Sequence, residues 1–252
     1  MDETFINYSK YSQYTMRIAW AVLLLVVSLI LIQNNALATV DNIDFFAGRT
    51  VAGKDLGYWA TEFWKWFHTV PNVLTPGQCY IGKDSNNSMI FLLNSMQESY
   101  KAQCDIESKP ILVPLLVSEC DITVGEKRLE SGKIEDFWAC AKEANEGFKE
   151  WQVALDNTDL IKSGQNIQTN QDQLEKILVR NTTFFNLTIP ENNRYDVTAG
   201  TYPAVVDGYY LILNPLPPGE HTLFVKIVRE NKEAGESLTP ETGEASYTLT
   251  VK

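Results

Sequence analysis

The feature that most constrains the fold is a series of strand-length segments separated by turn-forming residues. From residue 150 onward, apolar and polar residues alternate, as in strands that bury one face. Earlier segments are nearly all apolar, as in strands buried on both faces. The expected strands are residues 43–48, 88–94, 111–117, 150–155, 183–189, 204–213, 221–228 and 245–251. About eight strands predict a mainly β fold, a β-sandwich of the immunoglobulin-like or jelly-roll-like type.

Two other segments, residues 55–69 and 133–146, have apolar residues at helical spacing, and both helices should pack against the sandwich. Asp55 can cap the first helix. Pro114 should place its strand at an edge or in a bulge, because proline cannot donate a ladder hydrogen bond. Residues 159–176 are rich in Gln, Asn and Asp and are expected to form a polar loop with room for one helical turn.

The first helix is rich in aromatic residues and could bury them or display them to a ligand. At about 100° per residue, its apolar side chains cover an arc of roughly 160°, which is typical of a helix packed on a sheet. We predict that Trp59, Phe63 and Trp66 lie against the sheet. Trp64, at the edge of the arc, should be the most exposed ring and is a ligand candidate. The polar side of the helix carries Tyr58, Thr61, Glu62, Lys65 and His68.

The N-terminal segment is expected to be a signal peptide or a membrane anchor. Residues 18–32 form an uncharged run of 15 residues that follows Lys10 and Arg17. Ala36-Leu37-Ala38 has the small-x-small form of a signal peptidase site, which favours cleavage after residue 38. The alternative is a retained hydrophobic helix that contacts the membrane through residues 18–37. Both interpretations make residues 39–252 a single extracytoplasmic domain, either secreted or anchored to the cytoplasmic membrane.

All four cysteines lie in this exported part, and an even number outside the cytoplasm indicates two disulfides. Zinc is the competing interpretation, but no two cysteines have the close spacing of a zinc knuckle. We expect the pairs Cys79–Cys104 and Cys120–Cys140, since each encloses a short segment beside an apolar strand. Three sequons provide glycosylation candidates, namely Asn86, Asn181 and Asn186.

The charge of the chain limits its partners. The formal net charge is −11 at pH 7, and an acidic body repels the phosphates of nucleic acids. We therefore expect no nucleic-acid partner. The two histidines, His68 and His221, do not have the spacing of a zinc pair, and no cofactor is expected.

Three side chains in strands are further ligand candidates: Glu119, Asp207 and His221. Glu119 and Asp121 flank Cys120 and point the same way, so they could bind calcium or form an acid–base pair. The simpler interpretation is that both carboxylates are solvated. Asp207 lies in an otherwise apolar row, where a carboxylate needs donors. We predict that it accepts backbone N–H bonds or pairs with a basic group; the alternative is that Asp207, His221 and Glu119 converge on one cleft.

The order of motifs resembles a family of uncharacterised secreted proteins of bacteria and archaea, including ammonia-oxidising archaea. The N-terminal Trp-rich helix of that family matches "WATEFWKWFHTVP", with Phe63 replacing a Trp. Its "P-hydrophobic-hydrophobic-x-x-E-C" segment matches "PLLVSEC", and its C-terminal motif matches "VVDGYYLILNPLPPGEHT", with Tyr210 replacing a Trp. The resemblance covers most of residues 54–251. It implies a β-rich secreted domain, and it implies no reaction.

These features favour a non-enzymatic protein of the cell envelope that acts in structure or surface interactions. Its partners would be other envelope or membrane proteins, or surface glycans. The alternative is a carbohydrate-binding or carbohydrate-cleaving module, because sandwiches often hold sugars on aromatic faces. A pair of carboxylates beside exposed rings would favour that alternative.

Overall fold

The computed structural model describes residues 43–44, 50–71, 74–75, 77–93, 99–124, 129, 132–145, 148–163, 175–180, 183–193, 195–230 and 240–252. The chain divides into two units, Met1–Asp41 and Asn42–Lys252, and all of these residues belong to the second. The expected signal or anchor segment and the glycosylation candidate Asn181 lie outside the described residues. Among the helices in the described ranges, none is long and apolar enough to span a bilayer.

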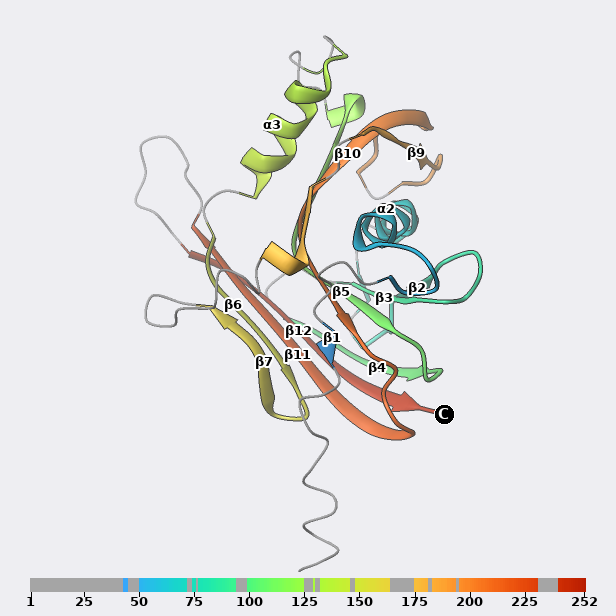
Figure 1. The fold of residues 1–252 in the computed structure, drawn as a ribbon, viewed down its shortest axis with the longest axis vertical. Helices are drawn as coiled ribbons and strands as arrows, with labels where there is room; N and C mark the ends of the chain where they lie inside the picture. The colour runs from blue at the N-terminus through green and yellow to red at the C-terminus, as the bar shows by residue number, and fades with distance from the viewer. Residues whose placement is uncertain are drawn as a thin grey trace, which may run out of the picture. The chain divides into compact units, whose positions relative to one another are not determined.

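Two mixed β-sheets form the body of the second unit (Figure 1). The first sheet consists of β1 (Ile43–Asp44), β2 (Ile81–Lys83), β3 (Ile90–Leu92), β5 (Ile111–Asp121), β8 (Leu178–Arg180), β9 (Phe185–Ile189) and β10 (Gly200–Leu213). The second consists of β4 (Tyr100–Ile106), β6 (Phe148–Leu155), β7 (Thr158–Ser163), β11 (Gly219–Glu230) and β12 (Pro240–Val251). The strand order is β1-β10-β5-β3-β2 in the first sheet, where β8 and β9 also pair with β10, and β4-β12-β11-β6-β7 in the second.

Apolar residues occupy both faces of the strand β10, a pattern that predicts a strand covered on both sides, and β10 is covered in this way. The helix α2 (Leu56–Phe67) lies on one face, where Phe63 contacts the ring of Tyr210 at 6.2 Å between centroids. On the other face, Tyr209 contacts Trp151 of the second sheet at 5.1 Å. The helix α3 (Ile134–Ala144) contacts β5 and β10 along the part of these strands that the second sheet does not cover (Figure 1). Both predicted helices are confirmed, and a short 3-10 helix, η2 (Ile122–Val124), follows β5.

The close approach of β5 and β10 depends on Gly208. The register shifts between Tyr209 and Tyr210, opposite Leu116 and Pro114, so the predicted bulge at Pro114 is present. At Gly208 the backbone has φ +146°, and a Cβ atom would lie 2.3 Å from the carbonyl oxygen of Leu116. Only glycine fits this position. β5 lies between β10 and β3, so the proline bulge occurs inside the sheet.

Several strands were not expected from the sequence. These are β2, β4, β7 and β8. The predicted polar loop over residues 159–176 is wrong at its start. A two-residue turn follows β6, and the chain then forms β7, which pairs with β6. β4 pairs in parallel with β12, whose residues are more than 130 positions away in the chain. The sequence next to β4 therefore contains no turn motif that would indicate this pairing.

The two disulfides tie together different layers of the fold. Cys79 precedes β2 of the first sheet and is bonded to Cys104 of β4 in the second sheet. Cys120 of β5 is bonded to Cys140 of α3. Both pairs are those predicted from the sequence. Tyr247 adds a polar link between the sheets, since its hydroxyl donates to the carbonyl oxygen of Leu93.

Peptide mapping under non-reducing conditions should find Cys79 linked to Cys104 and Cys120 linked to Cys140, because each pair joins neighbouring elements of the folded structure. Reduction before digestion provides the control, since it should release all four peptides. A crosslinked peptide that joins Cys104 to Cys120 would contradict the fold described here.

Candidate functional site

The described part of the chain contains a hollow of about 460 Å³ on the second sheet, and we call it the sheet hollow. Its lining comes from β6, β7, β11, β12 and the turn after β6. Its lining includes the polar and aromatic side chains of Gln152, Asn157, Asp159, Thr222, Phe224 and Thr248. Along β11, Leu223 and Val225 are buried between the sheets, so Thr222 and Phe224 alternate to the outer face. The sheet hollow therefore lies on the face directed away from the core.

The register of the strands explains why this face is hollowed. Phe224 pairs with Ala154 on one side and with Ser246 on the other. Both neighbours are small, so the partly exposed ring of Phe224 stands between two short side chains. Hydroxyl, amide and carboxylate groups surround the ring. Asp159 is the only acidic side chain among the described lining residues, and none of them is basic.

The turn between β6 and β7 is fixed by hydrogen bonds to β11. Asp156 and Asn157 have φ of +49° and +63°, a conformation that Asn and Asp tolerate in tight hairpin turns. The backbone N–H of Thr222 donates to Asp156 Oδ1 at 2.8 Å, and the backbone N–H of Asp156 donates to the carbonyl oxygen of Thr222, also at 2.8 Å. Asn157 therefore projects at the rim of the sheet hollow from a rigid turn.

The ligand candidate His221 supports this turn from beneath. It is buried, with Nδ1 2.8 Å from Asp156 Oδ2 and Nε2 3.0 Å from the carbonyl oxygen of Pro217. Both ring nitrogens thus have a partner within the protein. His221 positions the turn and does not line the sheet hollow. A second internal bond orients Asp159, because Gln152 Nε2 donates to Asp159 Oδ1 at 2.5 Å.

The ligand candidate Glu119 lies elsewhere, beneath the end of α2. Its Oε2 is 3.5 Å from Nε2 of His68, and the two side chains are 4% and 2% exposed. Asp121 is also buried, and its Oδ1 accepts from the backbone N–H and hydroxyl of Thr123. The interpretation of Glu119 and Asp121 as solvated carboxylates is therefore wrong. The segment before β10 adds to the cover, because the ring of Tyr195 contacts that of His68 at 5.5 Å.

Burial dominates the electrostatics of Glu119. Desolvation raises the pKa of its carboxyl group, the contact with His68 opposes this rise, and the nearby Asp121 adds to it, so that the resulting pKa is about 7. Glu119 Oε1, Asp121 Oδ2 and both ring nitrogens of His68 have no hydrogen-bond partner. Within the described ranges, no group of three or more His, Cys, Asp or Glu residues could hold a metal ion.

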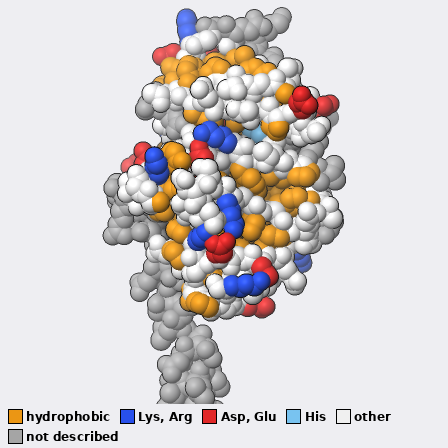
Figure 2. All heavy atoms as spheres, turned by 90° about the vertical axis from the view of Figure 1, so that its right-hand side faces the viewer, with side chains coloured by type: hydrophobic (Ala, Val, Ile, Leu, Met, Phe, Trp, Pro, Cys, Tyr) orange, Lys and Arg blue, Asp and Glu red, His pale blue; other side chains and the backbone are white. Residues whose placement is uncertain are grey.

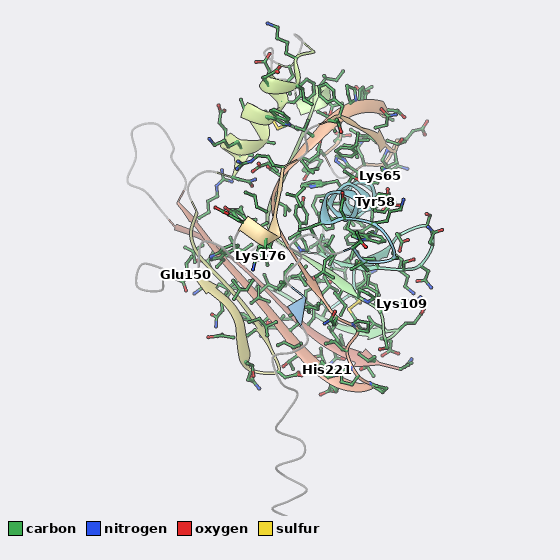
Figure 3. All side chains as sticks on the ribbon, in the orientation of Figure 1. Tyr58, Lys65, Lys109, Glu150, Lys176 and His221 are labelled. Atoms are coloured by element: carbon green, nitrogen blue, oxygen red, sulfur yellow. A yellow bond between two sulfur atoms is a disulfide. The ribbon has the colours of Figure 1, made fainter. Side chains whose placement is uncertain are left out.

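Asp207 has the structural role that the sequence predicts. Its Oδ2 is 2.7 Å from Arg180 Nε, and its Oδ1 accepts from Asn145 Nδ2 at 3.1 Å. Asp207 pairs with Ser118, whose hydroxyl bonds to α3, whereas Glu119 is on the α2 face. His221 belongs to the second sheet, far from α2 in Figure 3. These three candidates do not converge on one cleft.

The aromatic helix is buried more completely than its own periodicity predicts. Trp64 is 6% exposed and donates from Nε1 to the hydroxyl of Tyr210 at 2.8 Å, so the expectation of an exposed Trp64 is wrong. Thr61 and His68, expected on the polar side, are buried. The reason is that α2 contacts β8 and β9 as well as β10 and β2. Trp66 lies against the sheet as predicted, with its ring on Gly82.

The α2 side of the molecule presents a mixed surface. Figure 2 shows hydrophobic side chains in several areas of this side, broken up by charged side chains. Two glycosylation candidates are exposed: Asn86 in the turn between β2 and β3, and Asn186 in β9.

A scan against protein-family models and a search of curated proteins find no match to this chain. The sheet hollow is therefore the candidate functional site on geometric grounds.

Proposed function

We propose that this chain is a non-enzymatic, extracytoplasmic binding protein of the cell envelope. It is secreted or anchored through residues 18–37, and it contacts its partner through the outer face of the second sheet. The observation that carries this proposal is the sheet hollow, with its polar lining around one partly exposed ring. The helices α2 and α3 contact the first sheet, so neither of these two helices covers this face.

Three further observations support the compartment and the fold type. The two disulfides fit an oxidising environment. The resemblance to secreted bacterial and archaeal proteins favours the same compartment, and we propose membership of that family. Two sheets that share one hydrophobic core are compatible with an immunoglobulin-like or jelly-roll-like sandwich.

The lining of the sheet hollow favours binding over cleavage. Hydrolysis of a glycosidic bond ordinarily uses two carboxyl groups about 5–10 Å apart across the scissile bond. Asp159 is the single acidic side chain among the described residues of the lining. The carboxylates of Glu119 and Asp121 lie apart from the sheet hollow in β5, and both side chains are buried.

Pull-down of the tagged full chain from native membranes tests the proposal. Thr248→Trp places a large side chain in the sheet hollow and should abolish capture of the partners that the wild type retains. Thr250→Trp is the matched control, since Thr250 lies two positions further along β12 on the same face and outside the lining. Equal capture by both variants would contradict this assignment of the binding face.

A further inference from the structure

We propose that the sheet hollow binds a neutral oligosaccharide, with Phe224 as the platform for a sugar ring. This inference rests on the proposed function and names the ligand class of the same site. Its volume of about 460 Å³ falls within the range of roughly 300–1,000 Å³ that is typical of small-molecule sites.

The ring of Phe224 provides the apolar contact that a sugar needs. The face of an aromatic ring carries negative charge density and attracts weakly positive C–H groups. Ala154 and Ser246, which flank Phe224 in register, are too short to cover the ring from either side. The space beside the ring therefore suits a flat group that has C–H bonds on one side and hydroxyl groups at its edge.

The surrounding polar groups match the hydroxyl groups of a sugar. Gln152 and Asn157 each carry an amide that can both donate and accept, and Asp159 adds a carboxylate acceptor. Thr222 and Thr248 face each other across β11 and β12 and place two hydroxyl groups beside the ring. The contact between the side chains of Asp156 and His221 fixes the turn, and so holds Asn157 in place before a ligand binds. This lowers the entropic cost of binding.

Other ligand classes fit this lining less well. A peptide that adds a strand would pair along an edge such as β7, whereas Phe224 lies on β11, which is paired with β12 and β6 on its two sides. A nucleic acid or an anionic glycan needs basic groups, which the described lining lacks. A lipid chain needs a larger apolar surface than Phe224 and Ala154 supply, and a hard cation needs more carboxylate oxygens than Asp159 provides.

Calorimetric titration of the full-length protein with cellohexaose, mannohexaose and chitohexaose tests the inference, with hexagalacturonate as the charged comparison. We expect at least one neutral hexamer to bind. Phe224→Ala should weaken its affinity about tenfold or more, whereas Phe224→Tyr should retain it. Val228→Ala is the matched control, because Val228 lies on the same face of β11 outside the lining. Circular dichroism and thermal unfolding verify that each variant is folded.

The possible results separate this inference from the proposed function. Binding of no neutral hexamer, or of hexagalacturonate alone, overturns the inference. If Thr248→Trp still abolishes capture in that case, the proposed function stands with a protein partner. Binding of a hexamer that Phe224→Ala leaves unchanged overturns the assignment to the sheet hollow. His221→Gln should weaken the hexamer affinity with a smaller effect than Phe224→Ala, since His221 acts through Asp156; an equal or larger loss would overturn the placement of Phe224 as the platform.

Discussion

Replacing Trp59 with Ala should lower the free energy of unfolding by about 3–5 kcal/mol. The side chain is 1% exposed in the middle of α2 and belongs to the main hydrophobic core. Removing it leaves a cavity that neighbouring aromatic rings cannot fill, because they are held by their own contacts with the sheet. Urea unfolding followed by fluorescence or circular dichroism measures the effect.

Two variants bracket this result. Trp59→Phe should cost less than Trp59→Ala, because it retains an aromatic ring and removes an indole N–H that has no hydrogen-bond partner. Lys65→Ala, on the exposed side of the same helix (Figure 3), should change the stability by no more than about 0.5 kcal/mol. If Trp59→Ala were as stable as the wild type, the helix would not be part of the core.

Replacing Glu119 with Gln should stabilise the protein at pH 8 by up to about 3 kcal/mol and have little effect near pH 4.5. Burial raises the pKa of the Glu119 carboxyl from 4.5 to about 7 in the folded state. The folded protein thus binds this proton more tightly than the unfolded chain. The stability that this protonation contributes is complete below pH 4.5 and is lost as the pH rises through 7. Gln keeps the shape of the neutral carboxyl group and has no charge to bury.

Urea unfolding of both proteins at pH 4.5, 6 and 8 measures this difference. Subtracting the free energy of unfolding of one protein from that of the other removes the contribution of the titrating groups that both proteins share. Glu220→Gln, an exposed exchange on β11, should change the stability by no more than about 0.5 kcal/mol at each pH. A difference between wild type and Glu119→Gln that is the same at all three pH values would show that Glu119 does not titrate on folding.

Much of the scaffold follows from local patterns. Asp55 caps α2 by accepting from the backbone N–H of Tyr58 at 2.8 Å, and the helix begins one residue later. The two apolar rows of β10 correctly indicate that the strand is covered on both faces. Asp207 is the polar exception in those rows, and the cost of burying a lone carboxylate correctly predicts a basic partner.

The strand β4 was missed because its partner β12 is distant in the chain. In β4, Ala102 and Cys104 occupy inward positions, and such small side chains give a weak alternation. Pairing with β12 determines that this segment is a strand. The position of His68 depends in the same way on tertiary structure, since a single helix gives no sign that β9 and Tyr195 cover its polar side.

The sheet hollow could not be predicted for a related reason. Its residues come from three distant segments of the chain, and each segment reads as an ordinary strand or turn with small polar side chains. Only the register that places Ala154 and Ser246 on either side of Phe224 produces a depression. The residues Asp156 and Asn157 are typical of a turn, but the sequence gives no sign of the bond from Asp156 to His221.

If the chain is anchored and bound as proposed, the disulfide between Cys79 and Cys104 has a mechanical consequence. A partner on the outer face of the second sheet would pull on that sheet, while an anchor ahead of β1 would hold the first. Such tension acts to separate the two sheets, and apolar packing alone resists separation weakly once water enters. The bond joins β4 of the second sheet to the segment just before β2 of the first, so the load passes through a covalent link. Reduction would transfer that load to the shared core and to the short connection between β10 and β11.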